Sequence, residues 1–123
     1  MSIYIQARGF ALTEPLEQYV LGRVRLALGN HLDNIDRLQV RLSDINGPRG
    51  GADKRCSVHI ALPLQPDVVI EDVQTDMYDA VDSAVRRARH SVRRRLARMR
   101  AKVKRRKANK AVMEVEDGNP AAA

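Results

Sequence analysis

The chain has 123 residues, of which 44% are hydrophobic and 30% charged, and its formal net charge is +7. This length suits one domain of about 100 residues with a tail, and it excludes two independent hydrophobic cores. Aromatic residues make up only 3% of the chain, from which we expect no recognition surface built from stacked aromatic rings, such as an RNA-binding sheet that carries its bases on Phe and Tyr. A single cysteine, Cys56, excludes an internal disulfide, and no apolar run reaches the ~18 residues of a membrane span. We therefore expect a soluble, cytoplasmic protein.

The positive charge is concentrated in one segment of the chain. Residues 1–85 hold 8 Lys+Arg against 12 Asp+Glu, whereas residues 86–110 hold 14 Lys+Arg and no acidic residue. Like charges at this density repel one another, so a polyanion that neutralises them is the natural partner. The alternative is a solubilising charge run without a specific partner, which is less favoured because such runs usually mix both signs.

The first expected elements are a strand and a helix. Ile3, Ile5 and Ala7 alternate with polar or exposed positions, which predicts a strand. Thr13 then suits an N-cap, acidic residues follow in the first turn, and apolar residues recur at helical spacing as far as Leu28.

Three further strands are expected over residues 38–43, 56–62 and 68–73, because apolar and polar residues alternate in the first two and the third is a short apolar run. A turn-rich connection over residues 44–54 separates the first two of these strands.

The last expected element is a long amphipathic helix. Thr75 or Asp76 can cap it, and its apolar residues step by three or four as far as Val103. Beyond that point the apolar stripe is lost. We therefore expect one folded domain over residues 1–105 and a disordered tail over residues 106–123, which is first basic and then acidic.

The resulting order is β-α-β-β-β-α. Strands of this number with two amphipathic helices predict an α+β fold, in which both helices cover one face of a four-stranded sheet.

Two segments carry a resemblance to a known family. Thr-Glu-Pro-Leu at residues 13–16 opens the first helix, and Asp-Met-Tyr-Asp-Ala-Val-Asp at residues 76–82 opens the second, after a short strand. With this element order, the chain resembles the ribosome hibernation-promoting factors, also called ribosome-associated inhibitors or sigma-54 modulation proteins. The resemblance covers about residues 1–105, and the chain looks like a short form that lacks the dimerising second domain of longer members.

The resemblance implies a fold like that of double-stranded RNA-binding domains and a non-enzymatic function. Members of the family lodge between head and body of the small (30S) ribosomal subunit, over the mRNA and tRNA sites, and block translation in idle, stressed or stationary-phase cells. It thus implies binding to the subunit and its ribosomal RNA, no cofactor, no small-molecule substrate, and a monomer when free. Basic positions of the family fall on Arg23, Arg87, Arg94, Arg98 and Arg100.

The residues themselves point to the same surface. Cations around most of a helix can contact several RNA strands in a crevice, and the planar guanidinium of arginine bonds two phosphate oxygens at once. Two basic family positions are Leu26 and His90 here, where neighbouring arginines can compensate. The expected RNA-binding set is Arg23, Arg25, Arg86, Arg87, Arg89, Arg93, Arg94, Arg98, Arg100 and Lys102.

Other kinds of site find less support. The acidic residues near residue 80 are better explained as helix-capping groups, with Asp82 pairing with Arg86, than as a metal site. The Gly-rich loop at residues 46–51 lacks the ending of a phosphate-binding loop, and we expect a hairpin loop in which Arg49, Lys54 and Arg55 are secondary RNA contacts. No nucleophile–base arrangement indicates catalysis.

Two alternative functions stay open at the level of sequence. The first is a general RNA- or DNA-binding protein of the nucleoid or of RNA metabolism, and the second is a regulatory module that acts on a protein partner. A helix lying on a membrane is disfavoured, since the apolar stripe is rich in Ala and Val and has no Trp or Phe as an anchor.

Overall fold

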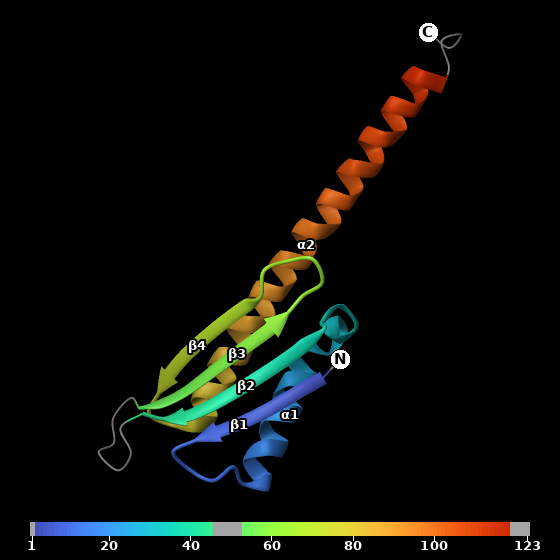
Figure 1. Cartoon of the computed structure of the whole chain (residues 1–123). Helices are drawn as coiled ribbons and strands as arrows, with labels where there is room; N and C mark the ends of the chain where they lie inside the picture. Colours follow the sequence, from blue (N-terminus) through green and yellow to red (C-terminus); the bar gives the residue numbers. More distant parts are fainter. Residues whose placement is uncertain (1, 46–52, 119–123) are drawn as a thin grey trace. The chain divides into compact units, whose positions relative to one another are not determined.

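The computed structural model of the chain describes residues 2–45 and 53–118. Within them lie the strands β1 (Ser2–Arg8), β2 (Arg37–Asp44), β3 (Lys54–Ala61) and β4 (Val68–Gln74), and the helices α1 (Glu14–Leu28), η1 (Gly29–Asn34, a 3-10 helix) and α2 (Met77–Gly118) (Figure 1). The predicted α+β class and the order β-α-β-β-β-α are confirmed.

The four strands form one mixed sheet in the order β1-β2-β3-β4. β1 and β2 are parallel, because α1 returns the chain between them, whereas β3 is antiparallel to both β2 and β4. In this register Ile5 lies opposite Val40, and Val40 lies opposite Val58. Alternation therefore places the apolar side chains of neighbouring strands on the same face of the sheet.

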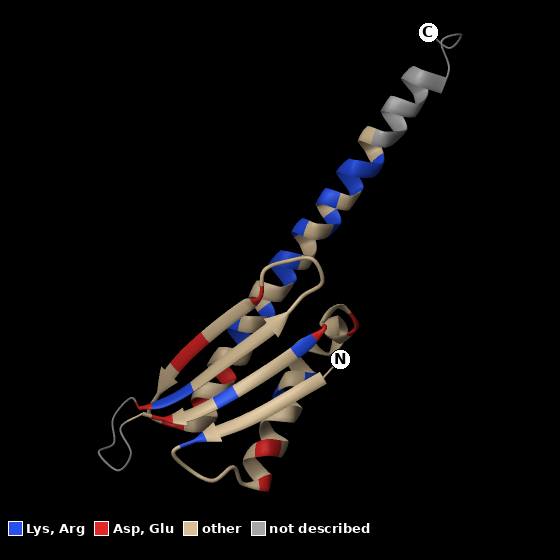
Figure 2. Cartoon of the chain, in the orientation of Figure 1, with Lys and Arg blue, Asp and Glu red and all other residues tan. Residues whose placement is uncertain are grey.

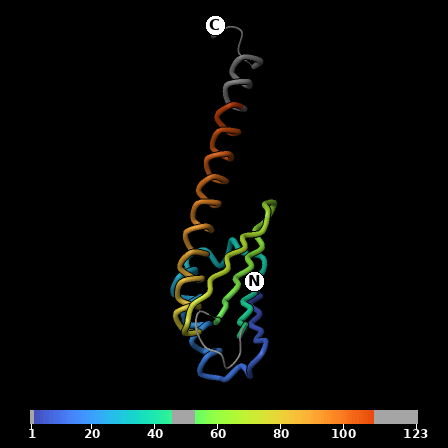
Figure 3. Tube along the Cα trace, turned by 90° about the vertical axis from the view of Figure 1, so that its left-hand side faces the viewer, coloured from blue at the N-terminus to red at the C-terminus, as the bar shows by residue number. Residues whose placement is uncertain are grey.

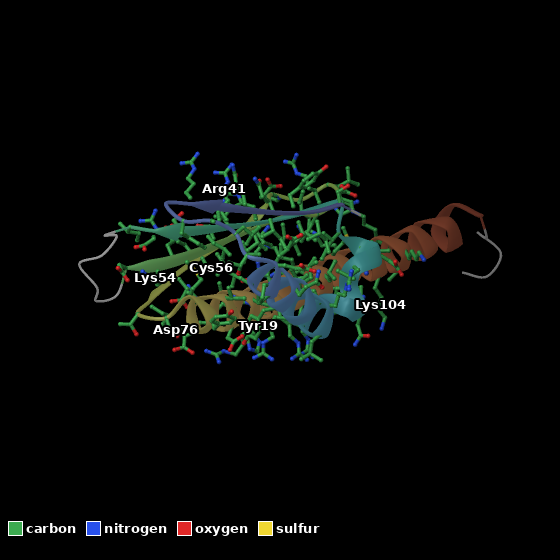
Figure 4. The ribbon with its side chains drawn as sticks, turned by 90° about the horizontal axis from the view of Figure 1, so that it is seen from below. Tyr19, Arg41, Lys54, Cys56, Asp76 and Lys104 are labelled. Carbon is green, nitrogen blue, oxygen red and sulfur yellow. The ribbon has the colours of Figure 1, made fainter. Side chains whose placement is uncertain are left out.

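The helices cover one face of the sheet. Figure 3 shows the strands on one side and the first turns of α2 on the other, and Figure 4 shows α1 in the same helical layer. Cys56 points into the space between the two layers, whereas Arg41 points away from the helices (Figure 4). We call the face that carries Arg41 the outer face of the sheet.

The hydrophobic core fills the space between the sheet and the helices. Each fully buried Val or Leu contributes about 1.5–3 kcal/mol relative to an exposed one, so the core depends on aliphatic residues from both layers. Fully buried members include Val20, Val24 and Leu28 of α1, Leu38, Val40 and Leu42 of β2, Val58 and Ile60 of β3, and Val81, Ala84, Ala88 and Val92 of α2.

Both long helices begin at the predicted caps. The backbone N–H of Leu16 donates to Oγ1 of Thr13 at 3.4 Å. At the start of α2, the backbone N–H groups of Tyr78 and Asp79 donate to Oδ1 of Asp76 at 2.7 and 3.4 Å. These bonds satisfy backbone donors that have no partner within the first helical turn, and they make Asp76 the cap of α2.

α2 extends further than the sequence predicted. It continues to Gly118, whereas a disordered tail was expected from residue 106. Residues 106–117 contain no Gly or Pro and are rich in Ala, Lys, Arg and Glu, which have high helix propensity even without an apolar face. Residues 119–123 of the expected tail lie outside the described residues.

The chain divides into two structural units, Met1–Val92 and Arg93–Ala123. The sheet, α1, η1 and residues 77–92 of α2 belong to the first unit, and the rest of α2 belongs to the second. Within the described residues, no helix combines the length and apolar character that crossing a lipid bilayer requires.

Two turn residues have positive φ. Gly9, just after β1, has φ 83°, and a Cβ there would lie 3.2 Å from the backbone oxygen of Asp44. Both observations explain a glycine at this turn. Leu64, between β3 and β4, has φ 57° and a fully exposed side chain, so an ordinary L-residue here adopts the left-handed region that glycine favours.

Candidate nucleic-acid interface

A groove of about 270 Å³ runs between α1 and α2 in the first unit. Three arginines from the two helices line it, and aliphatic side chains and one carboxylate complete its walls. The arginines provide charged N–H donors suited to phosphate oxygens, since bonds between charged partners are shorter and stronger than neutral ones. The lining residues are Arg23, Leu26 and Ala27 of α1 and Asp82, Val85, Arg86 and Arg89 of α2.

The carboxylate of the groove bridges the two helices. Asp82 Oδ1 accepts hydrogen bonds from Nε of Arg23 at 2.7 Å and from the hydroxyl of Tyr19 at 2.6 Å. The Tyr19 ring also meets that of Tyr78 edge to face, with ring centroids 4.7 Å apart, and the Arg23 guanidinium lies 5.7 Å from the centre of the Tyr19 ring. This cluster fixes the side chain of Arg23 at the edge of the groove. Tyr19 lies in the helical layer in Figure 4.

The cluster alters the ionisation of its members. Burial raises the pKa of Asp82, but the hydrogen bonds from Arg23 and Tyr19 and the charges of Arg23 and Arg86 outweigh it and hold that pKa below its usual value. The hydrogen bond to Asp82 raises the pKa of Arg23 and the pKa of Tyr19. Asp82 therefore stays a carboxylate, and its hydrogen-bonded partners are Arg23 and Tyr19 rather than the predicted Arg86.

Arg87 faces β4 instead of the groove. Its Nη1 donates to the backbone oxygen of Glu71 at 2.9 Å and lies 3.6 Å from Oδ2 of Asp72. Asp72 also accepts from the hydroxyl of Ser83 and, at 3.1 Å, from the amide of Gln74. Burial raises the pKa of Asp72, but these hydrogen bonds and the charge of Arg87 outweigh it and lower that pKa. Arg87 thus joins α2 to β4, an edge strand of the sheet.

The remaining predicted residues lie on exposed helical surface. Arg25 is exposed on α1, outside the lining of the groove. In the second unit, Figure 2 shows Lys and Arg following one another along α2. Its exposed cations include Arg93, Arg94, Arg98, Arg100 and Lys102. The structure thus brings Arg23, Arg86 and Arg89 together and directs Arg87 to β4. Arg25 lies apart from the groove on α1, and the remaining five lie along the second unit.

The cations expected near the hairpin loop are engaged within the protein. Nζ of Lys54 lies 2.9 Å from Asp44 and 3.4 Å from Asp53, and Nε of Arg55 lies 2.6 Å from Glu71. Their role as secondary RNA contacts stays a prediction. Residues 46–51, including Arg49, lie outside the described residues.

Cys56 belongs to the core. Burial, together with the charge of Asp72, raises its pKa to about 12, so the nucleophilic thiolate is scarce at neutral pH. Within the described part of the chain, no three His, Cys, Asp or Glu side chains are grouped to hold a metal ion.

Sequence reasoning missed the role of Asp82 as the acceptor that joins α1 to α2. The Asp82–Arg23 and Asp82–Tyr19 contacts span 59 and 63 residues, so the local spacing that suggested Arg86 could not reveal them. One signal was available in the sequence. Tyr19 and Arg23 lie four residues apart and therefore face the same side of α1, where they can share one acceptor on a neighbouring helix.

Comparisons with known proteins show the family of the chain and its similarity in fold to solved structures. The model of the family described as Sigma 54 modulation protein / S30EA ribosomal protein matches residues 3–100. A ribosomal subunit interface protein from Coxiella burnetii is similar in structure, with a TM-score of 0.67 and 15% sequence identity over 79% of this chain and 99% of that one. The N-terminal domain of Protein Y from Thermus thermophilus has a TM-score of 0.62 and 25% identity over 76% of this chain and 98% of that domain. No curated protein sequence gives a significant match.

Proposed function

The chain belongs to the Sigma 54 modulation protein / S30EA ribosomal protein family, and from this premise we propose that it binds the small ribosomal subunit and inhibits translation. In this proposal the domain occupies the channel that mRNA and tRNA use, and its arginines neutralise phosphates of ribosomal RNA. The action is steric, so inhibition requires the protein to occupy this channel and to remain bound.

The observation that carries this proposal is the arginine-lined groove between α1 and α2. Arg23, Arg86 and Arg89 come from two different helices, so together they can hold a phosphate backbone from two sides. The Asp82 bridge orients Arg23 before any ligand arrives, which lowers the entropy cost of binding. The second unit carries further exposed cations of its own.

The names of the similar structures support a ribosomal function. One is described as a ribosomal subunit interface protein, and the other is part of a protein of the same fold called Protein Y. At 15% identity the first likeness shows the fold alone. The family membership links this chain to a ribosomal function, and the groove supplies a physical means of binding RNA.

The proposed contacts recognise backbone and shape. Phosphate contacts position a protein on nucleic acid, and base-edge contacts give sequence specificity. The groove offers three arginines, aliphatic side chains and one carboxylate that is already bonded to Arg23 and Tyr19, and guanidinium groups match phosphate oxygens of any sequence. A folded RNA crevice of matching shape therefore explains selectivity better than a base sequence does.

The test is co-sedimentation with small ribosomal subunits over a range of salt concentrations. We expect the double variant Arg86→Gln/Arg89→Gln to bind at least about tenfold more weakly than the wild type, since each charged hydrogen bond contributes about 1.5–3 kcal/mol before screening. Subunit binding by the wild type should persist at salt concentrations that abolish its binding to a free RNA duplex, because shape-matched contacts are not screened.

A matched control separates the groove from net charge. Gln18→Glu/Asn30→Asp lowers the net charge by the same amount, at two exposed positions that do not line the groove, and it should bind nearly as well as the wild type. Equal losses in both double variants would contradict the groove as the site. Equal salt sensitivity for subunit and duplex would instead favour a general nucleic-acid-binding protein.

A further inference from the structure

We propose that the outer face of the sheet is a second binding surface, which takes a single strand of RNA. One base stacks on Tyr4, and phosphates of the same strand bind Arg37, Arg41 and Arg8. This surface lies on the side of the sheet opposite α1 and α2 (Figure 4). It therefore goes beyond the proposed function, which depends on the helices.

The three arginines form a line across β1 and β2. Arg37 and Arg41 are four residues apart on the same face of β2, which places them about 13 Å apart at the usual rise per residue. Arg8 of β1 lies opposite Ser43, two residues beyond Arg41 on the neighbouring strand. The line is thus about 20 Å long, which suits a few nucleotides of an extended strand.

These arginines have no acidic partner among the described residues. The hydrogen bonds and ion pairs of the described residues involve none of the three, and all three side chains are exposed. The one carboxylate on this face of the described strands belongs to Glu71, which is paired with Arg55 at 2.6 Å. Figure 2 shows basic residues on β1, β2 and β3, and acidic residues on β4 and at the end of β2. The β1–β2 side of the outer face is therefore positive, although residues 1–85 as a whole are acidic.

An exposed aromatic ring lies between the cations. Tyr4 is 54% exposed, and it pairs in register with Gln39, which lies midway between Arg37 and Arg41 on β2. A shallow hollow of about 410 Å³ is lined by Tyr4, Gln6, Arg37 and Gln39 together with Ile5. A ring for stacking, amides for a base edge and cations for phosphates are the groups that single-stranded nucleic acids require.

The geometry favours a single strand over a duplex. A base in a duplex has both faces covered by its neighbours and cannot stack on a side chain, whereas an unpaired base can. Composition predicts no RNA-binding sheet with stacked aromatic rings, whereas the structure exposes one ring, that of Tyr4, on this side. The surface therefore holds one base and depends on phosphate contacts for the rest of its affinity.

The experiment uses photocrosslinking of the full chain to a ten-nucleotide oligouridylate that contains one 4-thiouridine. After trypsin digestion, we expect a crosslink on the peptide of residues 1–8, which contains Tyr4. In Arg37→Gln/Arg41→Gln this crosslink should fall by about fivefold or more, because two phosphate contacts are lost. Tyr4→Ala should weaken oligouridylate binding at this face about tenfold through loss of stacking.

Two control variants separate binding at the outer face from effects of net charge and from binding in the groove. Gln18→Glu/Asn30→Asp matches the charge change and should keep the crosslink, as should Arg86→Gln/Arg89→Gln in the groove. The proposal is overturned if crosslinks map only to peptides of α2, or if the charge-matched control loses the residue 1–8 crosslink to the same extent. Thermal melting checks that each variant is folded. If Arg37→Gln/Arg41→Gln has a much lower melting temperature than the wild type, Tyr4→Ala, which lies on an edge strand, tests the surface in its place. Because the groove variant is measured separately, this result does not depend on ribosome binding.

Discussion

Nε of Arg23 lies 2.7 Å from Oδ1 of Asp82, and this contact joins the two helices that cover the sheet. The arginine is half-exposed at the groove, and the carboxylate that orients it belongs to the opposite helix. The same pair therefore has a structural role, which is to set the spacing of α1 and α2, and a functional one, which is to present a cation to a phosphate.

Asp82→Asn should destabilise the protein in a pH-dependent way. The folded pKa of Asp82 is lowered, so its contribution is complete above the unfolded pKa of about 3.9 and is lost as the pH falls through the folded value. We expect a loss of about 1 kcal/mol at pH 7, after allowance for solvent screening, and a smaller loss near pH 3, below the unfolded pKa. Urea denaturation at the two pH values measures the difference. Asp79→Asn is the control, and an equal, pH-independent loss in both variants would contradict this role of Asp82.

Cys56 should be inert in the native protein. Its thiol is fully buried and its pKa is raised to about 12, so a disulfide reagent such as Ellman's reagent reacts only after unfolding. At pH 8 the reaction should be slow in buffer and immediate in denaturant. A rapid reaction in buffer would show that β3 opens easily or that the residue is not in the core.

Truncation should separate the folded domain from the rest of α2. A chain ending at Val103 keeps the buried residues Val92 and Leu96, and its melting temperature should lie within a few degrees of the full chain. A chain ending at Ala88 lacks both and should lose roughly 3 kcal/mol or more, given about 1.5–3 kcal/mol for each buried aliphatic side chain. Global unfolding of the longer truncation would show that the folded domain needs residues beyond Val103.

Leu64→Gly should stabilise the protein. Leu64 has φ 57° and a fully exposed side chain, so the substitution relieves left-handed strain of about 1–2 kcal/mol and removes no packing. The greater freedom of glycine in the unfolded chain offsets part of this gain, which leaves about 0.5–1 kcal/mol. Chemical denaturation measures the change, and a loss of stability would mean that the Leu64 side chain has a contact partner in solution.

The fold could be read from the sequence because its signals are local. Alternation in residues 38–43 predicts the buried face of β2, and the side chains of Thr13 and Asp76 mark the starts of both helices, as the structure confirms. The end of α2 could not be read in this way. The loss of the apolar stripe after Val103 indicated the end of burial, but a segment rich in Ala, Lys and Arg stays helical without it.

The candidate site could be predicted only as a set of cations. Sequence placed Arg23, Arg86 and Arg87 in one binding set, but the structure assigns them different neighbours. Arg23 and Arg86 both line the groove, but only Arg23 is oriented by a hydrogen bond to Asp82, and Arg87 bonds to β4. These distinctions come from contacts between residues far apart in the chain, which periodicity does not encode.

The most direct test of the proposed function is inhibition of a cell-free translation system by increasing amounts of the protein. A factor that occupies the mRNA and tRNA channel must inhibit at about one molecule per ribosome when its affinity is high enough for stoichiometric binding. We expect inhibition to reach its plateau near that ratio. The Arg86→Gln/Arg89→Gln variant should require much more protein, whereas Gln18→Glu/Asn30→Asp should not. Full translation at several molecules per ribosome, under conditions in which the protein sediments with the small subunit, would contradict the proposed function.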